Sequence, residues 1–92
     1  MTYVYLMNNH KELTFDIIQK HVDYLKKLDD DGKLVLCGPF ADFPGGMVVF
    51  NSNSIEEAVS VAESDPFIAS GNKTYELRCL EVANAENNYL IP

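Results

Sequence analysis

The chain is short of several residue types, and each shortage excludes a class of protein. Its two cysteines, Cys37 and Cys79, are too few for a disulfide framework and too widely spaced for a metal-binding knuckle. We therefore expect two reduced, partly buried thiols and a cytoplasmic location. Because no histidine, cysteine and carboxylate cluster has zinc or iron spacing, we expect no metal.

Long apolar runs and a surplus of basic residues are also missing. No apolar stretch approaches the roughly 18–20 residues that cross a membrane, so we expect no membrane span. The first seven residues lack the basic region and cleavage site of a signal peptide. The chain has seven Lys and Arg residues and fourteen Asp and Glu residues, which gives a net charge of −7, so we expect no nucleic-acid partner.

What the chain does contain is clear periodicity within 92 residues, which we expect to form one domain over 1–92 with a C-terminal tail over 84–92. Thr14 is placed to cap a helix that Gly32 ends, and Ser54 with Glu57 resembles a capping box for a second. Alternating or continuous apolar runs predict strands between them. The expected strands are 3–7, 34–37, 47–50 and 74–82, and the expected helices are 15–31 and 55–64.

The order of these elements, βαββαβ, predicts an α+β fold of the ferredoxin-like type. Right-handed crossovers would place both helices on one face of a four-stranded antiparallel sheet. The other face would then be apolar and uncovered, and a second copy of the chain is the simplest cover. We therefore expect a homodimer packed sheet to sheet, which the apolar end of the 84–92 tail would latch.

One histidine stands out as a candidate acid–base residue. His21 lies between Ile18 and Leu25 on the apolar stripe of the first helix, and histidine suits proton transfer near neutral pH. Asp42, in the Gly/Pro-rich loop after the second strand, is its expected partner, because a carboxylate would orient the imidazole. The alternatives are a core histidine at position 21 and a turn-forming aspartate at position 42.

The same loop and the end of the second helix supply further candidates. Gly45 and Gly46 either let a ligand approach the backbone or permit the turn into the third strand. Asp65 is either a turn residue or part of a pocket, and Arg78 either binds a substrate carboxylate or pairs with a neighbouring carboxylate. The expected substrate-binding residues are Gly38, Pro39, Phe40, Gly45, Gly46, Asp65 and Phe67.

An ordered set of residues resembles the YciI-like, or YCII-related, family of the dimeric α/β-barrel superfamily over nearly the whole chain. The set comprises His21, Gly32, Gly38–Pro39, Asp42, Gly45–Gly46, Ser54 with Glu56–Glu57–Ala58, Asp65–Pro66–Phe67, Gly71, and Glu76 with Arg78. The resemblance implies a ferredoxin-like dimer, a pocket holding the histidine and aspartate as the catalytic pair, and no cofactor.

Its better-understood relatives resemble lyases or isomerases of small aromatic or lactone compounds. We therefore expect a small cofactor-independent enzyme that moves a proton on a small cyclic or aromatic compound through a His–Asp pair. The alternative is a non-catalytic dimeric module that binds a small ligand or a protein. An enzyme needs His21 beside a cavity with its titration tied to the aspartate, whereas a module needs neither.

Overall fold

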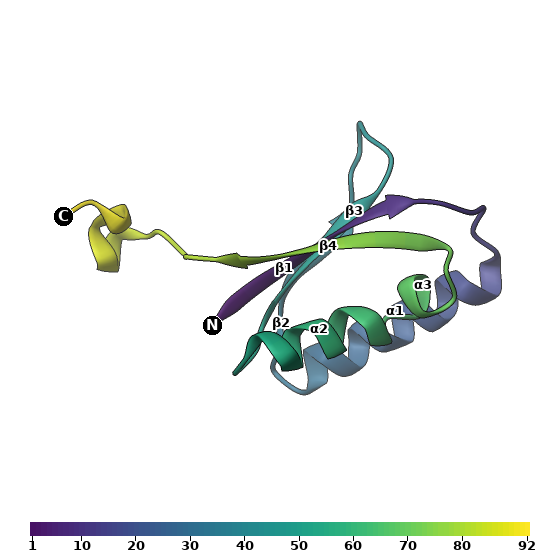
Figure 1. The fold of residues 1–92 in the computed structure, drawn as a ribbon, viewed down its shortest axis with the longest axis horizontal. Helices are drawn as coiled ribbons and strands as arrows, with labels where there is room; N and C mark the ends of the chain where they lie inside the picture. The colour runs from purple at the N-terminus through teal and green to yellow at the C-terminus, as the bar shows by residue number, and fades with distance from the viewer.

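The computed structural model describes residues 1–92, which form the expected βαββαβ order with one extra helical turn (Figure 1). The α3 turn lies between the second long helix and the last strand. The elements are β1 (Thr2–Asn9), α1 (Phe15–Asp30), β2 (Leu34–Pro39), β3 (Gly46–Asn51), α2 (Ile55–Ser64), α3 (Pro66–Ala69), β4 (Lys73–Leu80) and the 3₁₀ segment η1 (Ala85–Leu90).

The four strands form one antiparallel sheet in the order β2-β3-β1-β4. All three α-helices lie on one face of this sheet (Figure 1). This two-layer arrangement is the ferredoxin-like fold, as predicted. None of the helices is long and apolar enough to cross a membrane.

The predicted helix ends are confirmed by their hydrogen bonds. Thr14 Oγ1 accepts from the Ile17 amide at 3.2 Å at the start of α1. Gly32, just past its end, has a φ of +73°, which a residue with a side chain rarely adopts. Ser54 Oγ accepts from the Glu57 amide at the start of α2, although the Glu57 carboxylate reaches the Asn53 amide instead of closing the box on Ser54.

The core lies between the helices and alternate residues of the two central strands. Because side chains alternate across a strand, those on one face share a register: Tyr5 of β1 pairs with Val48 of β3, and both are fully buried. Helix residues cover them from below. The buried apolar residues are Tyr3, Tyr5, Met7, Leu28, Val48, Phe50, Ala58, Val61, Ala62 and Phe67.

Helix α1 buries a different stripe from the one its apolar residues predicted. Its buried residues are His21 and Leu28, whereas Phe15 is 83% exposed. Ile18 and Val22, expected in the core, are over a third exposed and line a cavity instead. The apolar stripe of α1 therefore serves two surfaces: part of it packs in the core, and part of it forms a wall of the cavity.

Strand β2 is an edge strand and is largely exposed, although its continuous apolar run is typical of a strand covered on both faces. Cys37 on β2 and Cys79 on β4 are likewise exposed rather than partly buried. A bulge between Leu34 and Leu36 shifts the register, so that Leu36 lies opposite Val49 on the face away from the helices. That face, which we call the open face, carries the apolar residues Val4, Leu6, Leu36, Met47 and Val49.

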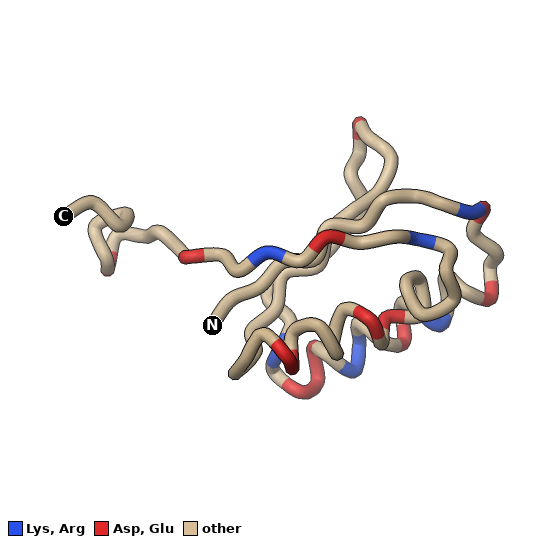
Figure 2. The backbone as a smooth tube through the Cα atoms, viewed as in Figure 1, with Lys and Arg blue, Asp and Glu red and all other residues tan.

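Charged residues are concentrated away from the centre of the sheet. Strands β1 and β3 contain no charged residue, whereas acidic and basic residues alternate along α1 and β4 (Figure 2). The tail runs beyond the end of β4 and away from the body of the domain (Figure 1). Tyr89 and Ile91 in this tail are 61% and 66% exposed.

Candidate functional site

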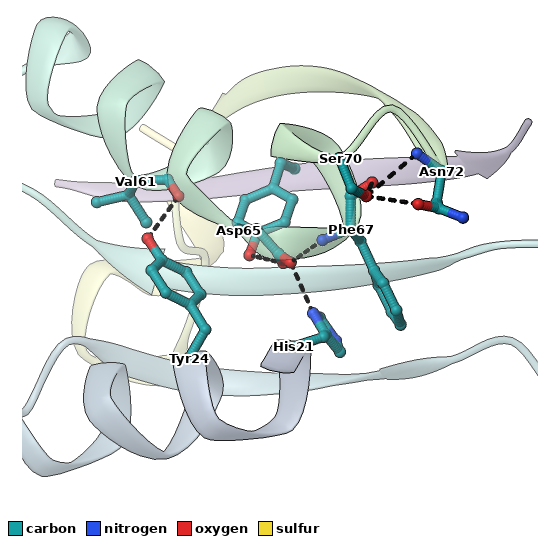
Figure 3. Close-up of polar contacts among 8 residues, drawn as sticks. His21, Tyr24, Val61, Asp65, Phe67, Ser70 and Asn72 are labelled. Carbon is teal, nitrogen blue, oxygen red and sulfur yellow. Dashed lines mark hydrogen bonds and ion pairs between the residues drawn. The ribbon is translucent and has the colours of Figure 1, made fainter. Parts of the chain in front are cut away.

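A buried histidine–aspartate pair lies between α1 and the start of α3. His21 Nδ1 is 2.8 Å from Asp65 Oδ1, and the two side chains are 11% and 0% exposed (Figure 3). His21 is in the middle of α1, and Asp65 is the residue that caps α3. Because α2 ends at Asp65–Pro66, the Asp65 carboxylate lies next to the His21 imidazole.

Both oxygens of Asp65 accept hydrogen bonds. Besides His21, the Phe67 amide donates to Oδ1 at 2.9 Å, and the Tyr5 hydroxyl donates to Oδ2 at 2.7 Å. Burial and the neighbouring Asp65 raise the pKa of Tyr5 far above its ordinary value, so its hydroxyl keeps its proton and remains a donor. Hydrogen-bond donors around a carboxylate stabilise its ionised form in a buried place.

This network selects one tautomer of the neutral imidazole. Since an ionised carboxylate only accepts hydrogen bonds, the proton between the two groups sits on His21 Nδ1. Nε2 is then unprotonated in the neutral ring, and no hydrogen bond engages it. Every side-chain nitrogen or oxygen that is fully buried in this structure has a hydrogen-bond partner. Because Nε2 has no partner, it is not fully buried, and it is accessible from the cavity that His21 lines.

Phe67 holds the imidazole from the side. The two rings stack with centroids 3.8 Å apart and planes 14° from parallel. Lys73 Nζ lies 4.5 Å from the centroid of the same Phe67 ring. Stacking restricts rotation of the imidazole, so its free nitrogen has a defined direction.

The cavity beside this pair has a volume of about 450 Å³, within the range of small-molecule sites. It opens between α1 and the neighbouring ends of β1, β2 and β3. Its walls are mostly apolar, and His21 and Lys73 are its ionisable nitrogen-bearing residues. The lining residues are Met7, Leu13, Ile18, His21, Val22, Leu25, Cys37, Gly38, Pro39, Gly46, Met47, Val48, Phe67 and Lys73.

A second hollow of about 300 Å³ lies between α1 and α2. Lys33 and Glu57 pair across its wall at 3.2 Å, and that ion pair lowers the pKa of Glu57. Tyr24, also in the wall, donates to the Val61 carbonyl at 2.6 Å. Lys33, Glu57 and Tyr24 are therefore already engaged, whereas Lys27 and Asp31 in the same wall form none of the ion pairs of the chain.

The pairing predicted for His21 was with the wrong aspartate. Asp42 is exposed in the β2–β3 loop and forms no ion pair, and this loop projects to the side of the sheet away from the helices (Figure 1). Asp65, which the sequence marked as a turn or pocket residue, takes the place beside His21. Its turn role is also present, since it caps α3 through the Phe67 amide.

The remaining predicted residues divide into two groups. Gly38, Pro39, Gly46 and Phe67 line the cavity, whereas Phe40 and Gly45 do not. Gly45 has a φ of +111°, and a Cβ there would collide with the Met7 carbonyl oxygen. Its role is therefore the turn and the close approach of two strands.

Two residues of the site gave no signal in the sequence. Tyr5 looked like any strand aromatic, and Lys73 like a solvated residue at a strand start. Lys73 is only 7% exposed, and burial lowers its pKa, an effect that Asp65 opposes. Arg78, the alternative anion binder, pairs with Glu76 at 3.4 Å on the surface.

Comparison with known proteins agrees with the resemblance seen in the sequence. The family model of the YCII-related domain matches residues 1–81. The chain belongs to the YCII family. It is 30% identical over 77 residues to the uncharacterized protein YjpA of Bacillus subtilis (strain 168), a match that covers 84% of this chain and 91% of YjpA.

A solved structure shares the fold of this YCII protein. It is 5-chloro-2-hydroxyhydroquinone dehydrochlorinase (TftG) from Burkholderia phenoliruptrix AC1100, in complex with 2,5-dihydroxybenzoquinone. The superposition has a TM-score of 0.70 at 18% identity and covers 96% of this chain and all of TftG. At this identity the likeness establishes the ferredoxin-like fold.

Proposed function

We propose that this YCII protein is a small enzyme that transfers a proton on a cyclic or aromatic compound without a cofactor, as a lyase or an isomerase. The observation that carries the proposal is the buried His21–Asp65 pair, whose free Nε2 opens onto an apolar cavity of about 450 Å³. A histidine held by a carboxylate beside a cavity is the arrangement of a general base.

In this proposal His21 and Asp65 have separate roles. Nε2 of His21 removes a proton from a hydroxyl or an acidic carbon of the substrate and later returns it. Asp65 stays ionised, keeps the other ring nitrogen protonated and stabilises the imidazolium that forms. Such proton transfer contributes typically ~10²–10⁴-fold to a rate, enough for an elimination or an isomerisation of an activated substrate.

The mostly apolar walls of the cavity and the structural relative favour a substrate with an aromatic or cyclic ring. Met7 and Val48 form the sheet side of the cavity and Ile18 and Val22 the helix side. TftG, which shares this fold, is a dehydrochlorinase of a hydroxyhydroquinone. We therefore place substituted hydroquinones first among candidate substrates and small lactones second.

The test is a turnover screen with two matched histidine variants. Chlorinated and unchlorinated hydroxyhydroquinones and small lactones would be incubated with the protein in D₂O and followed by ultraviolet absorbance and proton NMR. We expect His21→Asn to lower the rate of any turnover or solvent-deuterium incorporation by ~10²–10⁴. His10→Asn, at the exposed second histidine, leaves the rate unchanged.

Equal rates for wild type and His21→Asn would overturn the proposal. Ligand binding with neither turnover nor deuterium incorporation would favour the alternative, a non-catalytic small-ligand-binding module.

We also propose that the protein works as a homodimer joined through the open face. Leu36, on the edge of that face, is 51% exposed in the single chain, and it continues the apolar row of Val4 and Val49, of which Val49 is 5% exposed. A contiguous apolar surface of this kind marks an association site. The tail, with Tyr89 and Ile91 exposed, is the segment we expect to cross to the partner.

A further inference from the structure

Lys73 is a buried cation with no anionic partner. It is 7% exposed, yet it forms none of the ion pairs in the chain, and its Nζ makes no hydrogen bond. Its Nζ lies over the face of the Phe67 ring, 4.5 Å from the centroid. Burying a charge without a partner is costly, so a structural role alone does not account for Lys73.

The ammonium group is open to the cavity. Every fully buried polar side-chain atom of the molecule has a hydrogen-bond partner. Because Nζ has no such partner, it must retain some accessible surface. Lys73 as a whole is buried and lines the 450 Å³ cavity, so that surface faces the cavity. The His21 imidazole and Lys73 Nζ both contact the Phe67 ring, and all three residues line this one cavity.

We propose that Lys73 is the counter-ion of the ligand, and that the cavity selects cyclic or aromatic compounds carrying an anionic oxygen, a phenolate or a carboxylate. The inference rests on the proposed function in one respect, that the substrate occupies this cavity. The apolar walls take the ring and Nζ takes the oxygen, while His21 Nε2 stays free to move a proton. Because the site is largely desolvated, a charge-assisted hydrogen bond there is stronger than it would be in water.

Two observations argue against other partners for Nζ. Asp65 acts on Lys73 through its charge, but its two oxygens are already engaged by His21, Phe67 and Tyr5. Cys37, the other polar residue of the wall, has a pKa raised by burial and so remains a neutral thiol. An anion that satisfies Nζ has therefore to come from outside the chain.

Binding of paired probes tests this inference without any turnover. Benzoate and benzamide differ in charge but hardly in shape, and their dissociation constants would be measured by NMR titration. We expect wild type to bind benzoate at least ~10-fold more tightly than benzamide. Lys73→Met removes that preference while leaving benzamide binding unchanged, and Lys73→Arg retains part of it. Lys20→Met, at an exposed lysine paired with Asp16, behaves as wild type.

A phenol probe distinguishes the two sources of anionic oxygen. 4-Nitrophenol absorbs at a longer wavelength as the phenolate, so the spectrum of the bound probe reports its ionisation. If phenolates are the preferred class, wild type binds the ionised form at a pH where the free probe is neutral, and Lys73→Met does not. A benzoate preference without this spectral shift assigns the site to carboxylates.

The inference is overturned if benzoate and benzamide bind wild type equally, if neither binds at millimolar concentration, or if Lys73→Met keeps the benzoate preference. Failure of the proposed function gives a different result: the preference for benzoate is present and depends on Lys73, but no substrate is turned over. Asp65→Asn separates the two further, because we expect it to impair turnover and retain the benzoate preference.

Discussion

Asp65 receives His21 Nδ1 at 2.8 Å across 44 positions of sequence, and the same carboxylate oxygen caps helix α3 through the Phe67 amide. One residue thus ends α2, starts α3 and orients the imidazole. The residue that ends helix α2 also carries the carboxylate that binds His21. The fold of the backbone around Asp65 therefore fixes the position of the candidate base, His21.

The first prediction is that His21 and Asp65 act as one unit. Asp65→Asn lets the amide group donate to Nδ1, which moves the imidazole proton to Nε2 and removes the free base. We expect His21→Asn and Asp65→Asn each to lower turnover by ~10²–10⁴, and the double variant to be hardly slower than either. Nitrogen-15 NMR of the ring checks the change of tautomer, and independent, multiplicative effects would contradict the pairing.

A second prediction concerns Tyr5, whose hydroxyl donates to Asp65 Oδ2. Tyr5→Phe leaves that buried oxygen without its donor, and we expect a loss of about 1–3 kcal/mol in the free energy of unfolding, measured by urea denaturation. Tyr3→Phe is the matched control, since the Tyr3 hydroxyl makes a long contact of 3.9 Å with the Met1 sulfur and no hydrogen bond to Asp65. Equal losses in both variants would mean that the hydrogen bond to Asp65 makes no additional contribution to the free energy of unfolding.

The third prediction follows from the lowered pKa of Lys73, which burial causes. The unfolded chain holds this proton up to its ordinary pKa of about 10.4, so stability rises with pH between the folded value and that point. Lys73→Met removes the cost of burying the charge, and we expect it to stabilise the protein by about 1 kcal/mol at neutral pH.

The gain from Lys73→Met should shrink above pH ~10, where the wild-type lysine is neutral in both states. Melting temperatures from pH 6 to 11 measure this, with Lys20→Met as the control. A destabilised Lys73→Met would show that the lysine contributes to folding.

The fourth prediction is that alanine substitution lowers stability at one glycine of the β2–β3 hairpin and hardly changes it at another. Gly45→Ala forces a Cβ against the Met7 carbonyl at a φ of +111°, and we expect a loss of more than about 1 kcal/mol in unfolding free energy. A Cβ on Gly38 meets nothing within 4 Å, so Gly38→Ala should leave stability nearly unchanged. Because Gly38 lines the cavity, its variant tests ligand binding separately from folding.

The fifth prediction tests the open face as a dimer interface. Leu36→Asp places a charge on a residue that is 51% exposed in the single chain, so the protomer should stay folded while the dimer dissociates. Sedimentation velocity measures the assembly and circular dichroism the fold. A wild-type protein that sediments as a monomer at micromolar concentration would refute the dimer.

Much of the fold was predictable because its signals are local. Thr14, Gly32 and Ser54 mark helix ends through hydrogen bonds and backbone angles within a few residues of themselves, and the alternation in β1 and β3 follows from the period of a strand. The βαββαβ order then leaves few topologies, and the structure has the expected one.

The face that each strand presents was not predictable from alternation alone. Val48 lies beneath the helices and Val49 on the open face, and both are apolar. Leu34 and Leu36 would share a face in a regular strand, but the bulge between them separates the two. Such choices depend on which neighbours pack against each side, so they appear only when the layers are assembled.

The sequence by itself determined that His21 is a helix residue on an apolar stripe and that Asp65 stops a helix, because helix periodicity and the restriction before proline act locally. Only the tertiary structure decided that Asp65 rather than Asp42 meets His21, and that Lys73 is buried beside them. The reason is physical: α1, the α2–α3 junction and the start of β4 are brought together by packing on one sheet face, and no short-range rule records that distance.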